Sequence, residues 1–94
     1  MKENNLKFLE KAHATAVIIT LHQNGDMMKY EISSTIASQG SSIISDRLIE
    51  FEAKGIIRIR RERMTKYGHI VSLTDKGNMV AEHLIAIENI MASE

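Results

Sequence analysis

The stretch of sequence that decides the fold is KGIIRIRRERMTKYGHIVSLT, residues 54–74. Gly55 comes directly after a helical pattern, and it is expected just past the end of that helix because glycine takes the left-handed conformation there without strain. The next residues alternate between apolar and basic side chains, as in a strand with one buried face: Ile57, Arg58, Ile59 and Arg60. A turn over residues 65–68 and a second alternation over residues 70–73 then indicate a returning strand. The stretch therefore predicts a β-hairpin with a basic turn.

Helical patterns flank this hairpin on both sides. Residues 41–54 begin with serines that can cap a helix, and their apolar residues fall at i, i+4 and i+7: Ile44, Leu48 and Phe51. After the hairpin, Thr74 and Asp75 predict the start of a last helix over residues 75–92. The apolar residues of that helix are spaced 4, 3 and 4 apart, which is typical of a seam between two helices: Val80, Leu84, Ile87 and Met91.

The first third of the chain predicts a long helix, a short strand and a short helix. The long helix is expected over residues 5–23, with Gly25 after its end. Its apolar residues cover more than one narrow stripe, so we expect it to be buried on two sides, by its own core and by a partner chain. The elements that follow are a short edge strand at residues 27–29, a helix at residues 30–37 and a turn at residues 38–40.

Length and composition indicate one domain spanning residues 1–94. The chain has 94 residues, of which 44% are apolar, enough to form a core, and its charged fraction of 26% is ordinary for a soluble globular protein. It has no cysteine, which excludes disulfides and thiolate metal sites. No apolar run approaches the roughly 20 residues that span a bilayer, and the start lacks the order of a signal peptide. A cytoplasmic protein without membrane association is therefore expected.

The net charge is zero, but the charge is distributed unevenly. Residues 54–68 hold one acidic residue, Glu62, against six basic residues, which gives the segment a charge of +5: Lys54, Arg58, Arg60, Arg61, Arg63 and Lys66. The rest of the chain holds the other six basic and eleven acidic residues, a charge of −5. A basic ridge on a neutral body suits binding at a defined edge of the molecule.

A helix, a two-stranded basic hairpin and a second helix, in this order, are the layout of a winged helix. The predicted fold is therefore mainly α with a small β-hairpin, a winged helix-turn-helix domain. Three segments resemble the winged-helix regulators of the HxlR and MarR type: Glu31-Ile32, SDRLIEFEAKGII at residues 45–57 and VSLTDKG at residues 71–77. The resemblance covers roughly residues 30–80. It implies a dimeric DNA-binding transcriptional regulator whose dimer is built from the first and last helices.

In such a domain the helix over residues 41–54 would present its first residues to base edges in the major groove. The serines at its start, which can donate to bases or phosphates or simply cap a core helix, are Ser41, Ser42 and Ser45. Arg47 lies near the edge of the core face. It can reach a phosphate, or it can form an ion pair with Glu50 or Glu31.

The wing over residues 58–68 is the second candidate contact with DNA. Its candidate residues are Arg58, Arg60, Arg61, Arg63, Lys66 and Tyr67. Arginine at a wing tip can bind the phosphate backbone or the negative potential of a narrow minor groove, and Tyr67 can pack on a sugar or hold the turn. The alternative is an edge strand charged to prevent pairing between sheets. The density of basic residues exceeds what edge protection needs.

The predicted homodimer joins the helices over residues 5–23 and 75–92. Its expected contact residues are Leu9, Val17, Val80, Leu84, Ile87 and Met91. Two copies of the helix over residues 41–54 would then enter successive major-groove faces of one double-stranded DNA. The sequence does not indicate whether a small-molecule effector acts on the protein.

No motif in the sequence supports catalysis or a cofactor. The patterns G-x-S-x-G and G-x-x-x-x-G-K-[ST] are missing, and the four histidines lack a metal-binding spacing such as H-x-x-x-H. The chain is therefore predicted not to be an enzyme and to hold no metal or cofactor. The alternative function is a winged helix that binds another protein and no DNA, which the zero net charge favours.

Overall fold

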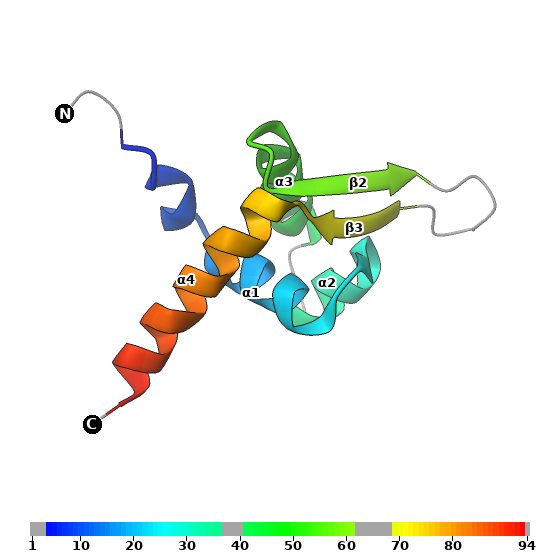
Figure 1. The fold of residues 1–94 in the computed structure, drawn as a ribbon. Helices are drawn as coiled ribbons and strands as arrows, with labels where there is room; N and C mark the ends of the chain where they lie inside the picture. The colour runs from blue at the N-terminus through cyan, green and yellow to red at the C-terminus, as the bar shows by residue number, and fades with distance from the viewer. Residues whose placement is uncertain (1–3, 37–40, 62–68, 94) are drawn as a thin grey trace.

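The computed structural model describes residues 4–36, 41–61 and 69–93. Its elements are a short 3-10 helix, α-helices and strands (Figure 1), in the order η1 Lys7–Glu10, α1 Ala14–Asn24, β1 Met27–Met28, α2 Lys29–Ile36, α3 Ser41–Ala53, β2 Ile57–Arg61, β3 His69–Leu73 and α4 Asp75–Ala92. The fold is mainly helical with one small sheet, so the predicted class is confirmed. The turns predicted at residues 38–40 and 65–68 lie outside the described residues.

The three strands form one antiparallel sheet in the order β1-β3-β2, with β3 in the middle. β3 pairs with β2 from Leu73 opposite Ile57 to His69 opposite Arg61. This register buries Ile57 and leaves the arginines of β2 exposed, as the alternation predicts: Arg58, Arg60 and Arg61. β1 pairs with the other side of β3 and is the short edge strand that the sequence predicts.

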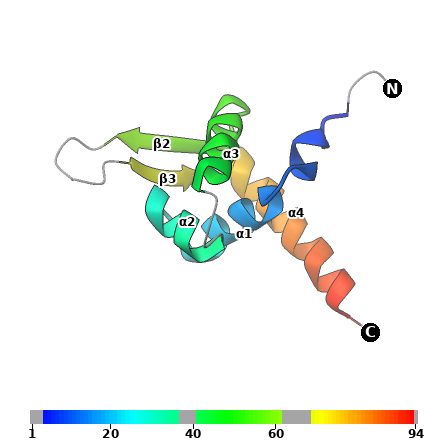
Figure 2. The ribbon, with the colours of Figure 1, turned by 180° about the vertical axis from the view of Figure 1, so that it is seen from behind.

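The core lies between the helices and the inner face of the sheet. α3 buries the residues that its spacing predicts: Ile44, Leu48 and Phe51. The other elements add branched and aliphatic side chains, chiefly Val17, Ile18, Leu21, Ile32, Ile57 and Val71. In Figure 2, α1 and α2 lie beneath the β2–β3 hairpin, and α3 lies at the base of the hairpin. Burial on this inner side fixes α3 with its opposite face outward.

The helix predicted over residues 5–23 is wrong as one continuous element. The chain forms η1, breaks at His13, whose φ of 64° lies in the left-handed region, and then begins α1 at Ala14. After this break, Phe8 packs edge-on against Phe51 of α3, with the ring centroids 5.9 Å apart. Packing between segments distant in sequence therefore outweighs the helical tendency of the alanine-containing stretch.

The ends of α1, α3 and α4 lie where the sequence predicts them. Gly25 follows α1 with a φ of 79°, and Gly55 follows α3 with a φ of 76°. Thr74 caps α4, because its hydroxyl oxygen accepts a hydrogen bond of 3.1 Å from the backbone N–H of Gly77. The same hydroxyl donates to the carbonyl oxygen of Gly55. This pair of bonds links the start of α4 to the end of α3.

The first turn of α4 packs directly against the backbone that follows α3. Gly77 is buried, and a Cβ atom at this position would overlap the carbonyl oxygen of Ile56. The close approach therefore requires glycine. From this point α4 extends away from the body, and the β2–β3 hairpin extends in the opposite direction (Figure 1 and Figure 2). Within the described residues, no helix, α4 included, combines the length and apolarity needed to cross a lipid bilayer.

Candidate nucleic-acid interface

The outer face of α3 is open to solvent along the helix. Because the core residues of α3 turn inward, its opposite face carries small, acidic and apolar side chains: Ser42, Asp46, Ile49 and Ala53. Of the predicted contact residues, Ser42 is exposed, Ser45 is half-buried, and Ser41 is the first residue of the helix. The serines thus lie in the N-terminal part of α3, which is the part of a recognition helix that meets base edges.

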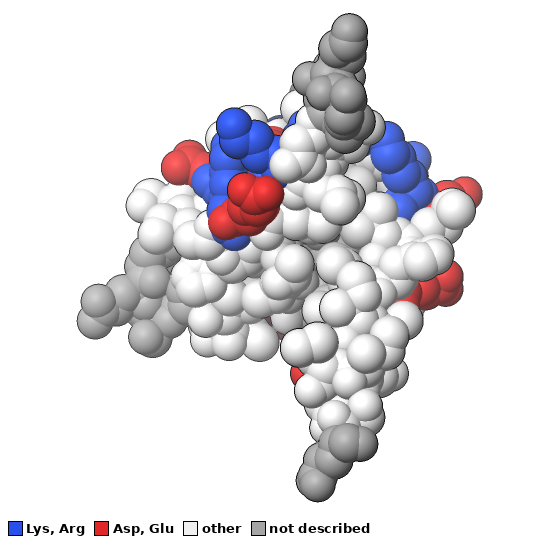
Figure 3. Space-filling model, turned by 90° about the vertical axis from the view of Figure 1, so that its left-hand side faces the viewer, with Lys and Arg blue, Asp and Glu red and all other residues white. Residues whose placement is uncertain are grey.

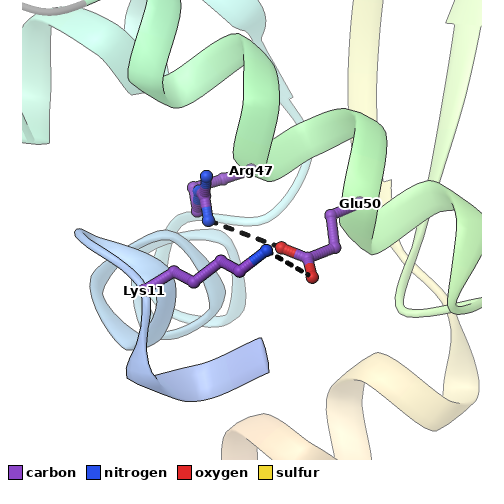
Figure 4. Close-up of polar contacts among 3 residues, drawn as sticks. All are labelled: Lys11, Arg47 and Glu50. Atoms are coloured by element: carbon purple, nitrogen blue, oxygen red, sulfur yellow. Dashed lines mark hydrogen bonds and ion pairs between the residues drawn. The ribbon is translucent and has the colours of Figure 1, made fainter. Parts of the chain in front are cut away.

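Arg47 does not lie on this outer face. Its side chain is only 12% exposed, and its Nη1 atom lies 3.4 Å from the Oε1 atom of Glu50. Glu50 also pairs with Lys11, whose Nζ atom lies 3.3 Å from Oε2, so that one carboxylate faces two cations (Figure 4). The ion-pair alternative therefore describes Arg47 in this structure, and the prediction that Arg47 contacts DNA is corrected.

The arginines of β2 are divided between the two faces of the hairpin. Arg58 and Arg60 share the solvent face, and Arg61 lies on the other face, beside α3. Arg60 is 3.9 Å from Asp26, and Arg61 is 3.8 Å from Glu52, but all four side chains are substantially exposed. Ion pairs this long and exposed are weak, so both arginines can exchange their partners for phosphates.

The remaining predicted wing residues lie outside the described residues: Arg63, Lys66 and Tyr67. Their roles as DNA contacts stay predictions. The described part of the wing alone therefore supplies three exposed arginines.

A hollow of about 200 Å³ joins the outer face of α3 to the wing. Its floor is apolar and includes Ile49, Ile59 and Val71, and cationic side chains of Lys29 and Arg61 contribute to its wall. The surface that approaches DNA in this fold is thus concave between helix and wing. A phosphate backbone can lie along such a basic rim.

The apolar residues of α4 fall into two groups, and this divides the predicted dimer contacts. Val80 and Leu84 are half-buried and pack against the core of their own domain, whereas Ile87 and Met91 are exposed. The exposed stripe also includes Met79 and Ile90. Figure 3 views the molecule from the side toward which α4 extends, and the surface over α4 there consists largely of uncharged side chains.

The predicted contacts from the N-terminal region are both changed by the structure. Val17 is 0% exposed and belongs to the core of the monomer, so it is not available to a partner chain and that prediction is corrected. Leu9 is half-buried and, with Val80, lines a hollow of about 590 Å³ between η1 and α4. Burial of α1 on more than one side is therefore achieved largely within the monomer, and no partner is needed for Val17.

Sequence reasoning did not assign Lys29, Asp46 or Ile49 to the interface. Asp46 and Ile49 follow from the positions of the core residues, since they fall between them on the helix and must face outward. Lys29 gave no such signal, because the first residue of α2 reaches the wing only through the tertiary fold.

No protein-family model and no curated protein matches this sequence. The fold does match solved structures. The protein AF1382 from Archaeoglobus fulgidus superimposes with a TM-score of 0.78 at 24% identity, over 97% of this chain and 100% of that chain. A possible HxlR family transcriptional factor from Thermoplasma volcanium gives a TM-score of 0.78 at 25% identity, over 96% of this chain and 80% of that chain.

The reduced form of MarR from E. coli gives a TM-score of 0.71 at 20% identity, over 86% of this chain and 62% of that chain. These similarities extend from η1 through α4 in the first two cases, since nearly the whole chain is covered. With its α2–α3 helix pair, its β2–β3 wing and its terminal helix, this chain has the winged helix-turn-helix fold of the HxlR- and MarR-type transcriptional regulators.

Proposed function

We propose that this chain is a transcriptional regulator that binds double-stranded DNA as a homodimer, with α3 in the major groove and the wing on the phosphate backbone or minor groove. The observation that carries the proposal is the placement of Arg58, Arg60 and Arg61 on β2 next to the exposed outer face of α3. The likeness in fold to structures named as transcriptional regulators supports it.

The division of labour between helix and wing follows from charge. Arg47 is the only lysine or arginine of α3, and it is turned inward by Glu50. The outer face of α3 therefore lacks a cation to hold phosphates, while β2 exposes three arginines within five residues. We assign the electrostatic part of DNA affinity to the wing and the contact with base edges to α3.

The proposed homodimer uses the exposed apolar stripe of α4: Met79, Ile87, Ile90 and Met91. These side chains follow helical spacing on one face, and the C-terminal part of α4 extends beyond the body of the domain (Figure 1). A second copy of the same stripe would cover both in an isologous contact. Each dimer would then present two α3 helices to half-sites about 34–36 Å apart, one turn of DNA.

The experiment that tests the DNA proposal is fluorescence anisotropy with a labelled mixed-sequence duplex, titrated at about 50 and 200 mM salt. For four to six phosphate contacts per dimer, affinity is expected to fall by roughly two to three orders of magnitude between these salts. Arg58→Glu is expected to weaken binding at least about tenfold at low salt, because it replaces an attraction with a repulsion at the wing.

The matched control is Lys7→Glu, which changes the net charge by the same amount. Lys7 is exposed on η1, which lies across the body from the wing (Figure 1). Binding by Lys7→Glu should stay within about twofold of the wild type. If the wild type binds no duplex at low salt, or both variants weaken binding equally, the proposal fails and the protein-interaction alternative takes its place.

A further inference from the structure

The outer face of α3 has an unusual chemistry for a surface that enters DNA. It carries a carboxylate and a branched alkyl side chain, Asp46 and Ile49, and its arginine is turned inward. We propose that Asp46 and Ile49 are the residues that determine sequence specificity, and that they read cytosine and thymine in the major groove. This inference rests on the proposed function and adds to it the bases that each half-site must contain.

Ile49 is suited to a thymine. Its side chain is 66% exposed, whereas the isoleucine and leucine before it on the inner face, Ile44 and Leu48, are almost fully buried. Ile49 therefore contributes little to the core, and its apolar surface is available for contact. In the major groove the C5-methyl group of thymine is the apolar group that distinguishes one base pair from another. Removing that methyl group should cost about three- to fivefold in affinity per contact.

Asp46 is suited to a cytosine. Its carboxylate is exposed, and no ion pair is formed with it by the residues that the structure describes. A carboxylate can only accept hydrogen bonds, so a purine edge, which presents the acceptor N7, opposes it. Cytosine presents the N4 amino donor, and its pairing with an aspartate is favourable. Phosphates repel this carboxylate, so it raises the cost of sites that lack the donor.

The spacing of the two residues fits neighbouring bases. Asp46 and Ile49 are three residues apart on one helix face, which places their Cβ atoms about 5–6 Å apart. Successive bases of one strand rise by about 3.4 Å. The two side chains can therefore reach bases one or two steps apart in the same half-site.

The test begins with selection of bound duplexes from a random pool by the wild-type protein, followed by replacement of each selected thymine with deoxyuracil. One replacement per half-site is expected to weaken wild-type binding about three- to fivefold and to have no effect on Ile49→Ala. Because Ile49 is exposed, this variant keeps its core, and circular dichroism checks its folding. Ser42→Ala, on the same helix face, is the control and should keep the uracil effect.

Asp46→Asn supplies a second, independent readout. Asparagine pairs with the N6 and N7 atoms of adenine, so the selected base at one position is expected to change from cytosine to adenine by at least about fivefold. If the wild type selects a site but the uracil effect survives in Ile49→Ala and Asp46→Asn selects the same base, this inference is overturned and the proposed function stands. If the wild type retains no duplex at all, the proposed function itself fails.

Discussion

The ammonium of Lys11 lies 3.3 Å from the carboxylate of Glu50, and this ion pair joins the segment before α1 to α3. Glu50 is shared, because Arg47 approaches its other oxygen at 3.4 Å (Figure 4). The two cations differ in environment: the side chain of Lys11 is 50% exposed, and that of Arg47 is 12% exposed. The Nε atom of Arg47 is buried without a hydrogen-bond partner among the described residues. Arg47 therefore depends on Glu50 much more than Lys11 does.

This asymmetry predicts different costs for two substitutions that each remove the Lys11–Glu50 pair. Glu50→Gln should lower the free energy of unfolding by about 1–3 kcal/mol, because it leaves the poorly solvated Arg47 without a counter-charge. Lys11→Gln should cost less than about 1 kcal/mol, as exposed pairs do. Urea denaturation at a fixed protein concentration measures both. An equal or larger loss in Lys11→Gln would show that the exposed cation is the essential one.

Gly77→Ala should destabilise the protein although alanine normally favours a helix. The added Cβ atom would overlap the backbone carbonyl oxygen of Ile56, which cannot move aside as a flexible side chain would. We expect a loss of about 1–3 kcal/mol in the free energy of unfolding. Urea denaturation of Gly77→Ala and of Ala86→Gly, an exposed position of the same helix, separates this overlap from helix propensity. A Gly77→Ala protein as stable as the wild type would contradict the close packing of α4.

Ile90→Glu should dissociate the proposed dimer. The substitution places a charge within the exposed apolar stripe of α4, and burying it against a second copy costs free energy on both sides of a two-fold contact. We expect the dissociation constant of the dimer to rise at least about tenfold. Sedimentation equilibrium over a range of concentrations measures it.

Asn89→Glu is the control for this prediction, since Asn89 is exposed on the same turn of α4 but lies off the apolar stripe. It introduces the same charge, and its dimer should dissociate like that of the wild type. Equal behaviour of the two variants would exclude the stripe as the contact surface and would require another arrangement of the two copies.

Arg60→Gln should change the salt dependence of DNA binding in a countable way. If each protomer loses one phosphate contact, the dimer loses two, and the slope of log Kobs against log salt becomes less negative by about 2. The affinity should fall similarly for every duplex sequence, because phosphate contacts carry no base information. Titrations at four or more salt concentrations give the slope. An unchanged slope would mean that Arg60 keeps its pairing with Asp26 and does not reach DNA.

Local patterns in the sequence were sufficient for most of the fold. The alternation of Ile57 to Arg60 predicts which face of β2 is buried, and the spacing of Ile44, Leu48 and Phe51 predicts the inner face of α3. Both patterns depend on the period of one element, so they can be read without knowledge of its neighbours.

The failures involve contacts between distant segments. The left-handed conformation of His13 accompanies the packing of Phe8 on Phe51, which lie far apart in the sequence. Arg47 had equally plausible partners in the sequence, and the additional charge of Lys11 near Glu50 appears only after the break before α1. Val17 was assigned to a partner chain because an apolar side chain has the same chemistry whether its own core or a second copy covers it.

The opposite directions of the wing and α4 give this neutral molecule a positive end and a negative end. The exposed arginines of β2 lie at one end, and α4, with Asp75, Glu82 and Glu88 against Lys76, lies at the other. Close to a duplex, such a charge separation experiences a torque that turns the wing toward the phosphates before the surfaces meet. Productive encounters then form a larger fraction of all collisions, so added salt should slow association more than it speeds dissociation.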